Sequence, residues 1–321
     1  MRDSLTDTFN MSIKNIIMKK IIILLPLLFI IANSFGQNFV EIAKVYYGTS
    51  SLNNFEKSNS KTRVNELGLD TTIPIVINPS NAFLTGVIYE RIQTRLFELN
   101  PAEQTISSLA LKAGLSKKHS DKWSGYYILL PKLASDFIRI GRQDFQFGAI
   151  ALLKYTKQEN LHYKLGAYYN TELSGPFFMP LFGVYYLSDN KKVETNLTLP
   201  FLVEINYILH TRLNIGVNFS GQVRSYHLNE IPTNINNDGY VVKSTNELST
   251  YLKFNLIKGL SLQARMGYTL GRSYRVYDAR EKITFGSILL KVGDQRPQLN
   301  TDFSDGFVFQ SSMIYRFVPD K

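Results

Sequence analysis

Five charged residues lie in alternating segments of the sequence, each on the side opposite to the apolar residues. They are Lys164, Glu204, Arg224, Lys253 and Arg265. If these segments are strands of a closed barrel in a membrane, their polar sides face the lumen, so we predict that the five residues line it. Two roles are open: a network in which charges and amides satisfy one another, or the wall of a pore that favours anions. We favour the network, because side chains can fill much of a barrel of about 12 strands.

Catalytic groups show no recognisable pattern. The four histidines, His119, His162, His210 and His227, fall on separate segments, and none has a serine and a carboxylate at the local spacing of a hydrolase motif. No His, Asp and Glu cluster has metal-ligand spacing, and the absence of cysteine excludes disulfides and thiolate sites. We therefore predict no enzyme and no cofactor. The alternative is an outer-membrane hydrolase that depends on His162 or His227, because distant residues can converge in a fold.

The clearest alternation runs from Asn246 to Tyr277 and predicts two strands joined by a turn at Ile257–Gly259. In the second limb the apolar positions are Leu260, Leu262, Ala264, Met266, Tyr268 and Leu270. Both limbs reach the roughly 9 to 11 residues that a tilted strand needs to cross a bilayer. Strands of a soluble β-sandwich typically have only about 5 to 6 residues. The length therefore favours a membrane barrel.

Similar alternation recurs along the chain. It predicts strands over residues 37–47, 82–97, 106–115, 123–134, 147–155, 161–169, 197–209 and 213–224. Glu90 falls on the apolar side of its segment and breaks the pattern there. Pro74 interrupts the weak alternation of residues 61–78, which suggests a strand end, an edge or a bulge. Residues 135–144 are predicted to be a loop or a helical turn.

These segments predict an all-β fold, an antiparallel transmembrane outer-membrane β-barrel. The length of the chain fits about 12 strands, with 10 and 14 as alternatives. Tyrosines on the apolar sides, such as Tyr163, Tyr169, Tyr207 and Tyr268, fit the aromatic girdles of a barrel better than ligand platforms.

The N-terminal region predicts export. Lys19 and Lys20 precede an apolar run, Ile21 to Ile31, which is followed by small residues and a cleavage site between Gly36 and Gln37. This run is too short for a transmembrane helix, which needs about 20 apolar residues. We therefore divide the chain into an upstream extension (1–17), a signal peptide (18–36) and a single barrel domain (37–321).

The chain of 321 residues has a formal net charge of +10, but its Lys and Arg residues are scattered rather than gathered in runs. We therefore predict no binding to nucleic acid. A wet lumen, or a rim near anionic lipid headgroups, accounts for the charge. The predicted partners are outer-membrane lipid and, during insertion, the barrel-assembly machinery.

Turn lengths predict sidedness, because periplasmic turns of such barrels are short and extracellular loops are longer. His210–Arg212 and Ile257–Gly259 are predicted to be periplasmic and Asn229–Gly239 extracellular. Asp278 to Asp305 must then be one extracellular excursion. Lys282 to Lys291, although alternating, cannot be a lone crossing, so it either protrudes or hides a second strand.

Several short motifs support the same fold. They are the run Pro180-Leu181-Phe182-Gly183-Val184-Tyr185-Tyr186, the turn Asp189-Asn190-Lys191-Lys192, the pair Leu199-Pro200, and Tyr207. With them the chain resembles an outer-membrane barrel family of Gram-negative bacteria known only as a domain of unknown function. The resemblance implies a barrel and its location, but no catalytic residues. The C-terminal segment, with Phe307, Phe309, Met313, Tyr315 and Phe317 on one side, resembles the closing strand of such barrels.

The function predicted from these patterns is passive: a pore for small solutes or a structural component of the envelope. Besides the hydrolase, a surface receptor or adhesin is an alternative that would depend on the loops Asn229–Gly239 and Asp294–Ser304. The sequence names no solute or ligand.

Overall fold

The computed structural model describes residues 40–231, 238–286, 291–292 and 294–317. The predicted extension (1–17), signal peptide (18–36) and cleavage site between Gly36 and Gln37 lie outside the described residues. Within these residues, no helix combines the length and apolar character needed to cross a membrane.

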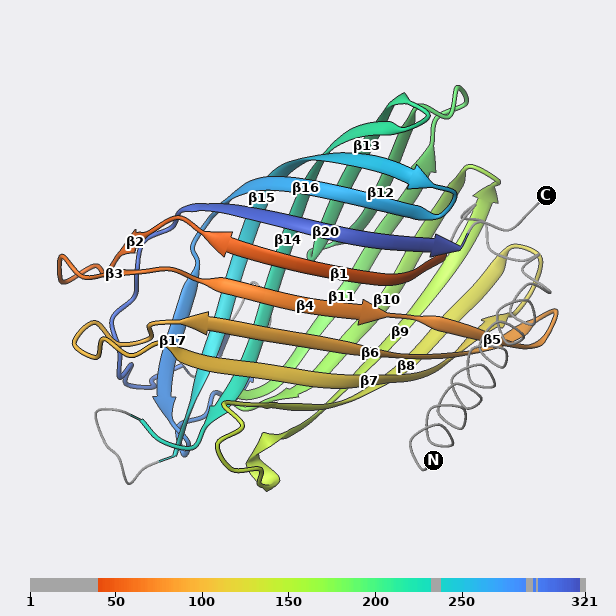
Figure 1. Cartoon of the computed structure of the whole chain (residues 1–321). Coiled ribbons are helices and arrows are strands. Elements are labelled where there is room, and N and C mark those ends of the chain that lie inside the picture. Colours follow the sequence, from red (N-terminus) through yellow and green to blue (C-terminus); the bar gives the residue numbers. More distant parts are fainter. Residues whose placement is uncertain (1–39, 232–237, 287–290, 293, 318–321) are drawn as a thin grey trace, which may run out of the picture. The chain divides into compact units, whose positions relative to one another are not determined.

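Strands make up most of the described chain (Figure 1). Those of the first half are β1 (Val40–Ser50), β2 (Asn53–Asn54), β3 (Lys61–Thr62), β4 (Asn65–Thr71), β5 (Ile73–Asn78), β6 (Asn81–Thr94), β7 (Gln104–Lys118), β8 (Trp123–Ser135), β9 (Phe145–Gln158) and β10 (Leu161–Glu172). Those of the second half are β11 (Gly175–Leu187), β12 (Val193–Leu199), β13 (Leu202–His210), β14 (Leu213–Leu228), β15 (Gly239–Ile257), β16 (Leu260–Thr269), β17 (Ser273–Asp278), β18 (Phe285–Gly286), β19 (Lys291–Val292) and β20 (Phe307–Phe317). A 3-10 turn, η2 (Arg142–Asp144), precedes β9, so the helical-turn alternative for residues 135–144 is confirmed.

The strands form a closed antiparallel barrel, because β1 pairs with the final strand β20 as well as with β4. β4 and β5 both pair with β6, and β16 and β17 both pair with β15, so each pair makes one crossing. Counted this way, the described residues make fourteen crossings, the upper of the predicted alternatives. The all-β barrel predicted from the sequence is confirmed.

The two rims of the barrel differ in loop length. At the rim where β1 begins and β20 ends, which we name the terminal rim, the connections are 79–80, 119–122, 159–160, 188–192, 211–212 and 258–259. At the opposite loop rim they include 51–64, 95–103, 136–144, 229–238 and 279–306. Short turns are periplasmic in such barrels, and the expectation that the terminal rim is periplasmic stays a prediction. Asp278 to Asp305 form one connection at the loop rim, as predicted, and β18 and β19 pair within it. That this connection is extracellular stays a prediction.

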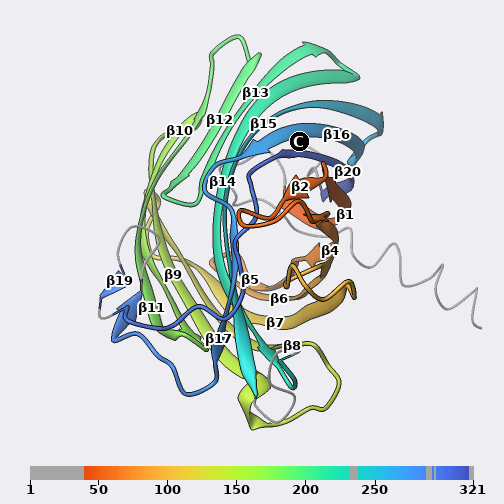
Figure 2. The same cartoon turned by 90° about the vertical axis from the view of Figure 1, so that its left-hand side faces the viewer.

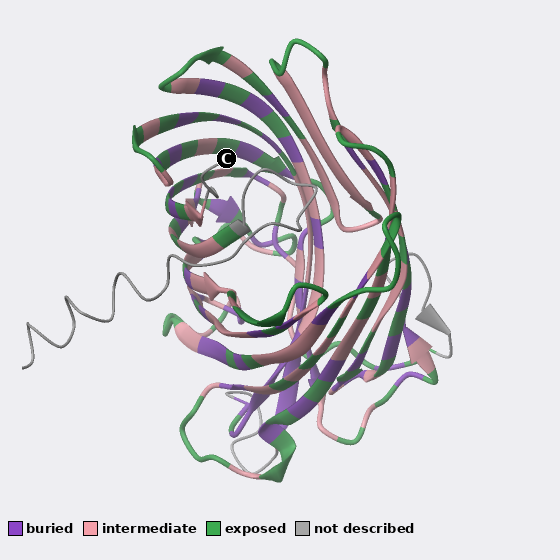
Figure 3. Ribbon diagram, turned by 90° about the vertical axis from the view of Figure 1, so that its right-hand side faces the viewer, coloured by how far each residue is buried: buried purple, intermediate pink, exposed green. Residues whose placement is uncertain are grey.

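Outward side chains form an apolar surface around the wall, and Figure 3 shows the resulting alternation of buried and exposed positions along the strands. In the hairpin of β15 and β16, Leu248, Leu252, Phe254, Leu262 and Met266 are all exposed. The tyrosines predicted for the girdles, Tyr163, Tyr169, Tyr207 and Tyr268, are also exposed. Exposed apolar side chains on a closed antiparallel sheet are what a lipid-facing surface requires.

The loop-rim halves of β14 and β15 leave the wall and cross the barrel interior. Figure 2 shows β14 running between β9, β10 and β11 on one side and β1, β4, β6 and β7 on the other. The end of β14 reaches β8, where His227 pairs with Ser135. We name this element, made of residues 221–228 of β14, 239–245 of β15 and the attached β17, the partition. It divides the loop-rim half of the interior into two compartments.

One predicted strand was wrong. Residues 197–209 were expected to form one continuous strand, but β12 ends at Leu199 and β13 begins at Leu202. The two strands form a tight hairpin, in which Leu197 pairs with Val203. Directly paired residues point to the same face of a sheet, and the paired positions here are both odd-numbered. The alternation therefore continues through the turn, and periodicity alone does not detect it.

Candidate functional site

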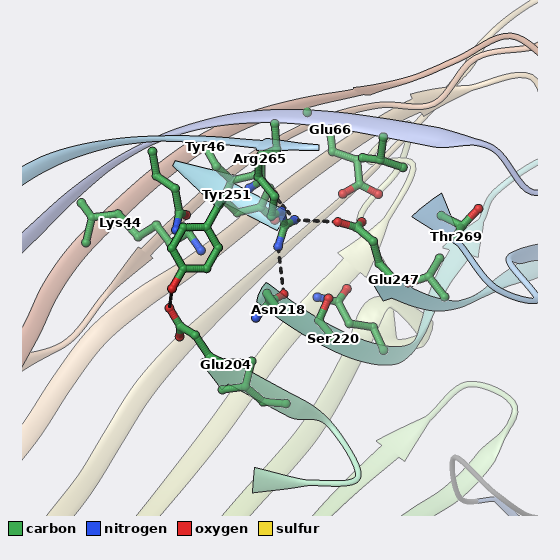
Figure 4. Close-up of a pocket in the computed structure, with 18 of the residues that line it drawn as sticks. Lys44, Tyr46, Glu66, Glu204, Asn218, Ser220, Glu247, Tyr251, Arg265 and Thr269 are labelled. Carbon is green, nitrogen blue, oxygen red and sulfur yellow. Dashed lines mark hydrogen bonds and ion pairs between the residues drawn. The ribbon is translucent and has the colours of Figure 1, made fainter. Parts of the chain in front are cut away.

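A polar cavity of about 450 Å³ lies inside the barrel (Figure 4). Residues of β1, β4, β11 to β17 and β20 line it, from Glu41 and Arg316 near the terminal rim to Ser50 and Arg272 near the loop rim. Its charged lining residues are Glu41, Glu66, Glu194, Glu204 and Glu247 and, with the opposite sign, Lys44, Lys243, Arg265, Arg272 and Arg316. Five acidic and five basic side chains leave the lining close to neutral.

Arg265 of β16 reaches furthest across the cavity. Its Nη1 donates to Oδ1 of Asn218 on β14 at 3.3 Å, and its Nη2 lies 3.3 Å from Oε1 of Glu247 on β15. Nη2 also donates to Gln310 of β20. The inward side chains of four strands thus meet at one guanidinium, whose planar fork suits several oxygen acceptors at once.

A second polar group lies nearer the terminal rim. The Tyr251 hydroxyl donates to Oε1 of Glu204 at 3.1 Å and lies 3.2 Å from Oδ1 of Asn206. Lys44, on the opposite wall, makes neither a hydrogen bond nor an ion pair with any described residue, and its Nζ lies 6.0 Å from the centre of the Tyr46 ring. An ammonium without a partner beside carboxylates and hydroxyls can bind a polar solute.

An apolar layer borders the cavity at the loop rim. Val64 and Tyr274 line the cavity and also pack in a buried cluster with Phe55 and Phe303. Phe303 stacks on Tyr274 at 5.6 Å and meets Phe55 edge-on at 5.8 Å. We name Phe55, Val64 and Phe303 the cap. Phe55 comes from the first loop and Phe303 from the last, so the cap depends on two segments that are far apart in sequence.

The five residues predicted to line the lumen all lie on inward positions, but only two lie on the cavity. Glu204 and Arg265 line it. Lys164 donates instead to Asn196 at 2.7 Å, and Lys253 is buried beside the Tyr251 ring. Arg224 lies on the partition and pairs with Glu90 of β6 at 2.5 Å. The structure thus brings Glu204 and Arg265 to one cavity and places the other three in separate contacts.

Sequence reasoning missed the strongest charge cluster. Glu90, with 1 % of its side chain exposed, binds Arg224, the Tyr226 hydroxyl at 2.6 Å and Nζ of Lys243 at 2.8 Å. Lys243 also pairs with Glu66 at 2.7 Å. The one available signal was that Glu90 interrupts an apolar face. A buried carboxylate needs compensating charges, and those lie more than a hundred positions away.

Among the described residues, the histidines do not assemble a catalytic triad. His227 is buried with its Nδ1 2.7 Å from Oδ1 of Asp144, while among the described residues its Nε2 has no hydrogen-bond partner and so no hydroxyl in reach. His162 is buried and stacks on Tyr185 at 5.6 Å. His119 contacts the Tyr127 hydroxyl in a terminal-rim turn. Within the described residues, no group of His, Asp and Glu could hold a metal ion.

The last loop is attached to the barrel. Asn300 donates to the carbonyls of Leu96 and Tyr274. Nη1 of Arg296 donates to the Tyr240 hydroxyl at 2.9 Å, and its other nitrogens bind Asp294 at 2.8 Å. Burial acts to lower the pKa of Arg296, but the hydrogen bonds to Asp294 and Tyr240 outweigh it and raise the pKa. Of the other predicted receptor loop, residues 232–237 lie outside the described part.

Comparisons with known proteins give a family and a set of barrels. A family model described as Domain of unknown function (DUF6268) matches residues 32–292. A search of curated proteins gave no match.

Among solved structures, the chain is similar to an outer membrane channel of Pseudomonas putida F1, with 9% identity, a TM-score of 0.46 and coverage of 89% of this chain and 100% of that one. It is also similar to the toluene transporter TodX of Pseudomonas putida (9% identity, TM-score 0.33, coverage 86% and 90%). A third is the translocator domain of the autotransporter NalP from Neisseria meningitidis (10% identity, TM-score 0.36, coverage 87% and 89%). These similarities identify no residues that act in this chain.

Proposed function

This chain belongs to the family described as a domain of unknown function (DUF6268), and we propose that it is an outer-membrane channel that admits small polar solutes to the cavity between β1, β14, β16 and β20. The observation that carries the proposal is the cavity itself. It has the volume of a small-molecule site, which is roughly 300 to 1,000 Å³, and it reaches the terminal rim.

The balance of charge in the lining points to the kind of solute. With equal numbers of acidic and basic side chains, the cavity repels neither ion strongly. Amides, hydroxyls and carboxylates converge on it, together with the unpaired ammonium of Lys44. Neutral polar or zwitterionic molecules fit this lining better than anions do. The anion preference considered from the sequence therefore receives no support from the charge balance.

We expect passage to require the cap to move, because Phe55 and Phe303 pack with the lining residues Val64 and Tyr274 at the loop-rim end of the cavity. The test is conductance of the refolded protein in a planar bilayer. The unsubstituted protein is expected to give small, intermittent currents with weak ion selectivity. The double substitution Phe55→Ser with Phe303→Ser removes the apolar contact and should raise the open fraction several-fold. Leu99→Ser is the control, because Leu99 is exposed on the same rim and outside the cap.

Two results would contradict the proposal. If neither protein conducts although both are folded, as judged by heat-modifiable gel migration, a structural role in the envelope would replace the channel. A strong preference for anions would refute the charge-balance argument. It would favour instead the pore hypothesis based on Lys164, Arg224, Lys253 and Arg265.

A further inference from the structure

The barrel wall is incomplete beside the short hairpin of β12 and β13. On β11 the pairing with β12 begins only at Phe182, and on β14 the pairing with β13 ends at Ser220. Among the described residues, positions 178–181 of β11 have no ladder partner on that side, and positions 222–226 of β14 pair only with β15. The two strands are therefore not joined by a ladder across the gap, although the Val223 side chain of β14 packs against β11.

The loop after β17 bridges the gap at the loop rim. The Ile283 amide donates to the Ser174 carbonyl at 2.7 Å, and Phe177 pairs with Gly286. On the other side, the Tyr240 hydroxyl of the partition donates to the Glu281 carbonyl. Residues 279–286 thus run from the partition to the end of β11. The break is framed on all sides: β11, the β12–β13 turn, the partition and this bridge.

The break lies at a lipid-facing level of the wall. On the outward side of β11, Phe178 is 41 % exposed, and its neighbours Tyr169 on β10 and Phe147 on β9 are similarly exposed. Phe178 pairs directly with Tyr169. These aromatic side chains therefore lie at the same height along the barrel wall as the break. Large outward aromatic side chains at this height indicate contact with membrane rather than with water.

The interior behind the break is apolar, unlike the polar cavity. Phe177, Met179 and Leu181 point inward from β11 and are buried. Around them pack Ile150, Leu152, Tyr168, Phe201 and Val223. The Tyr168 ring meets Phe201 edge-on at 5.8 Å and Phe177 at 6.1 Å. An inward apolar cluster is unusual in a barrel of this kind, whose interior is generally polar.

We propose that the break is a lateral window through which an uncharged, apolar molecule dissolved in the membrane reaches the cluster around Met179. The side chains that form the cluster are aliphatic or aromatic. The nearest carboxylate on β10, Glu172, is already bound by Ser225 and Lys132. Both faces of β11 are apolar at this height, so such a molecule stays out of water as it passes from lipid to the cluster. This inference does not depend on the polar cavity.

The absence of cysteine from the chain allows a clean labelling experiment. Single substitutions Met179→Cys and Leu152→Cys place a thiol in the cluster, and Ser220→Cys places one in the polar cavity as the matched control. Each refolded variant, in lipid vesicles, is treated with a pyrenyl maleimide, which dissolves in the membrane, or with a charged trimethylammonium thiosulfonate. The cluster thiols should react at least tenfold faster with the maleimide than with the charged reagent. Ser220→Cys should show the opposite order.

The same variants distinguish the other possibilities. Cluster thiols that react with neither reagent would mean a sealed core, and a faster reaction with the charged reagent would mean a water-filled passage. Either result overturns the window. Excess naphthalene should slow maleimide labelling of Met179→Cys at least threefold by occupying the cluster. No slowing would mean that lipid chains, rather than an apolar solute, reach the cluster, and the proposed occupant would be wrong. Leu152→Cys protects the conclusion if Met179→Cys fails to fold.

Discussion

The two faces of the partition are held to the wall by different contacts, although they belong to the same strands. On the face toward β6, the partition supplies two cations, Arg224 and Lys243, and the wall supplies the carboxylate of Glu90 between them. On the face toward β10, at the same level, the partition supplies the neutral Ser225, whose amide and hydroxyl donate to Glu172.

The location of the balancing charge explains how this difference affects the attachment of the partition to the wall. Glu172 faces a cation, Lys132 at 3.5 Å, but both residues belong to the wall, on β10 and β8. An ion pair within one layer stabilises that layer, whereas pairs between layers resist their separation. The partition is therefore held to β6 by ion pairs, whereas its contact with β10 is made by a neutral serine that donates to the Glu172 carboxylate. The side on which it is less firmly held is the side of the proposed window.

Glu90→Gln tests this comparison most strongly. It leaves Lys243 buried and Arg224 partly buried, with Glu66 as the remaining carboxylate near Lys243. Removing one partner of a buried ion pair typically costs about 3–5 kcal/mol, because the other charge stays uncompensated. We expect a loss of that size in the free energy of unfolding, measured by urea titration in lipid vesicles.

The control for this substitution is Glu103→Gln on the exposed loop between β6 and β7. It should leave the urea midpoint unchanged, since an exposed carboxylate gains little from its surroundings. If Glu90→Gln costs less than about 1 kcal/mol, the partition is not held by charge, and the contrast between its faces fails.

The regular wall was predictable from the sequence, because each wall strand has one lipid face and one lumen face. Alternation identified the β15–β16 hairpin and most strands from β6 to β10, and the turn lengths that predicted the sidedness do differ between the two rims. The number of strands was harder to predict, because odd-numbered residues lie on the same face before and after the β12–β13 turn. When a turn keeps paired residues on the same face of the sheet, the alternation of apolar and polar positions continues through it, and the turn cannot be detected from that alternation.

The partition was not predictable by the same logic. Its residues are buried on both faces, as Tyr226 and Tyr240 show. Neither face therefore needs the apolar residues of a lipid-facing surface or the polar residues of a lumen-facing surface. On β6 the apolar side faces inward, because it packs against the partition. Glu90 lies on that side and therefore interrupted the alternation from which the strand was predicted. The lining of the cavity was found only for Glu204 and Arg265. The other lining residues depend on where the partition bends, which no local pattern specifies.

Glu172→Gln tests the second face and should have a smaller effect. The amide oxygen of glutamine still accepts from Ser225, and Lys132 loses a partner at 3.5 Å within its own layer. The expected loss is about 2 kcal/mol, as for one hydrogen bond to a charged group. The measurement is the same urea titration, run beside Glu90→Gln. Equal losses for the two variants would show that both faces are tied equally and would weaken the case for a window.

Substitution of Gly271 tests the bend at which the wall continues into the partition. We expect it to change the free energy of unfolding less than the substitutions of Glu90 and Glu172. It lies between β16 and β17 with φ of 71°, in the left-handed region, and a Cβ placed there would meet no atom within 4 Å. Asp305 accepts from the amides of both Gly271 and Arg272, at 2.7 and 2.9 Å, and fixes the bend. Gly271→Ala should therefore cost about 1 kcal/mol through backbone strain alone.

Asparagine at position 271 separates strain from packing, because it adopts the left-handed region more readily than alanine. Gly271→Asn should cost less than Gly271→Ala in the same urea titration, although its side chain is larger. The opposite order would mean that the new side chain collides with its surroundings, and the bend would then be set by packing. If strain decides, the bend is a property of the backbone at this position. The partition then turns inward whether or not the charges on its β6 face are present, and those charges determine only how firmly it is held.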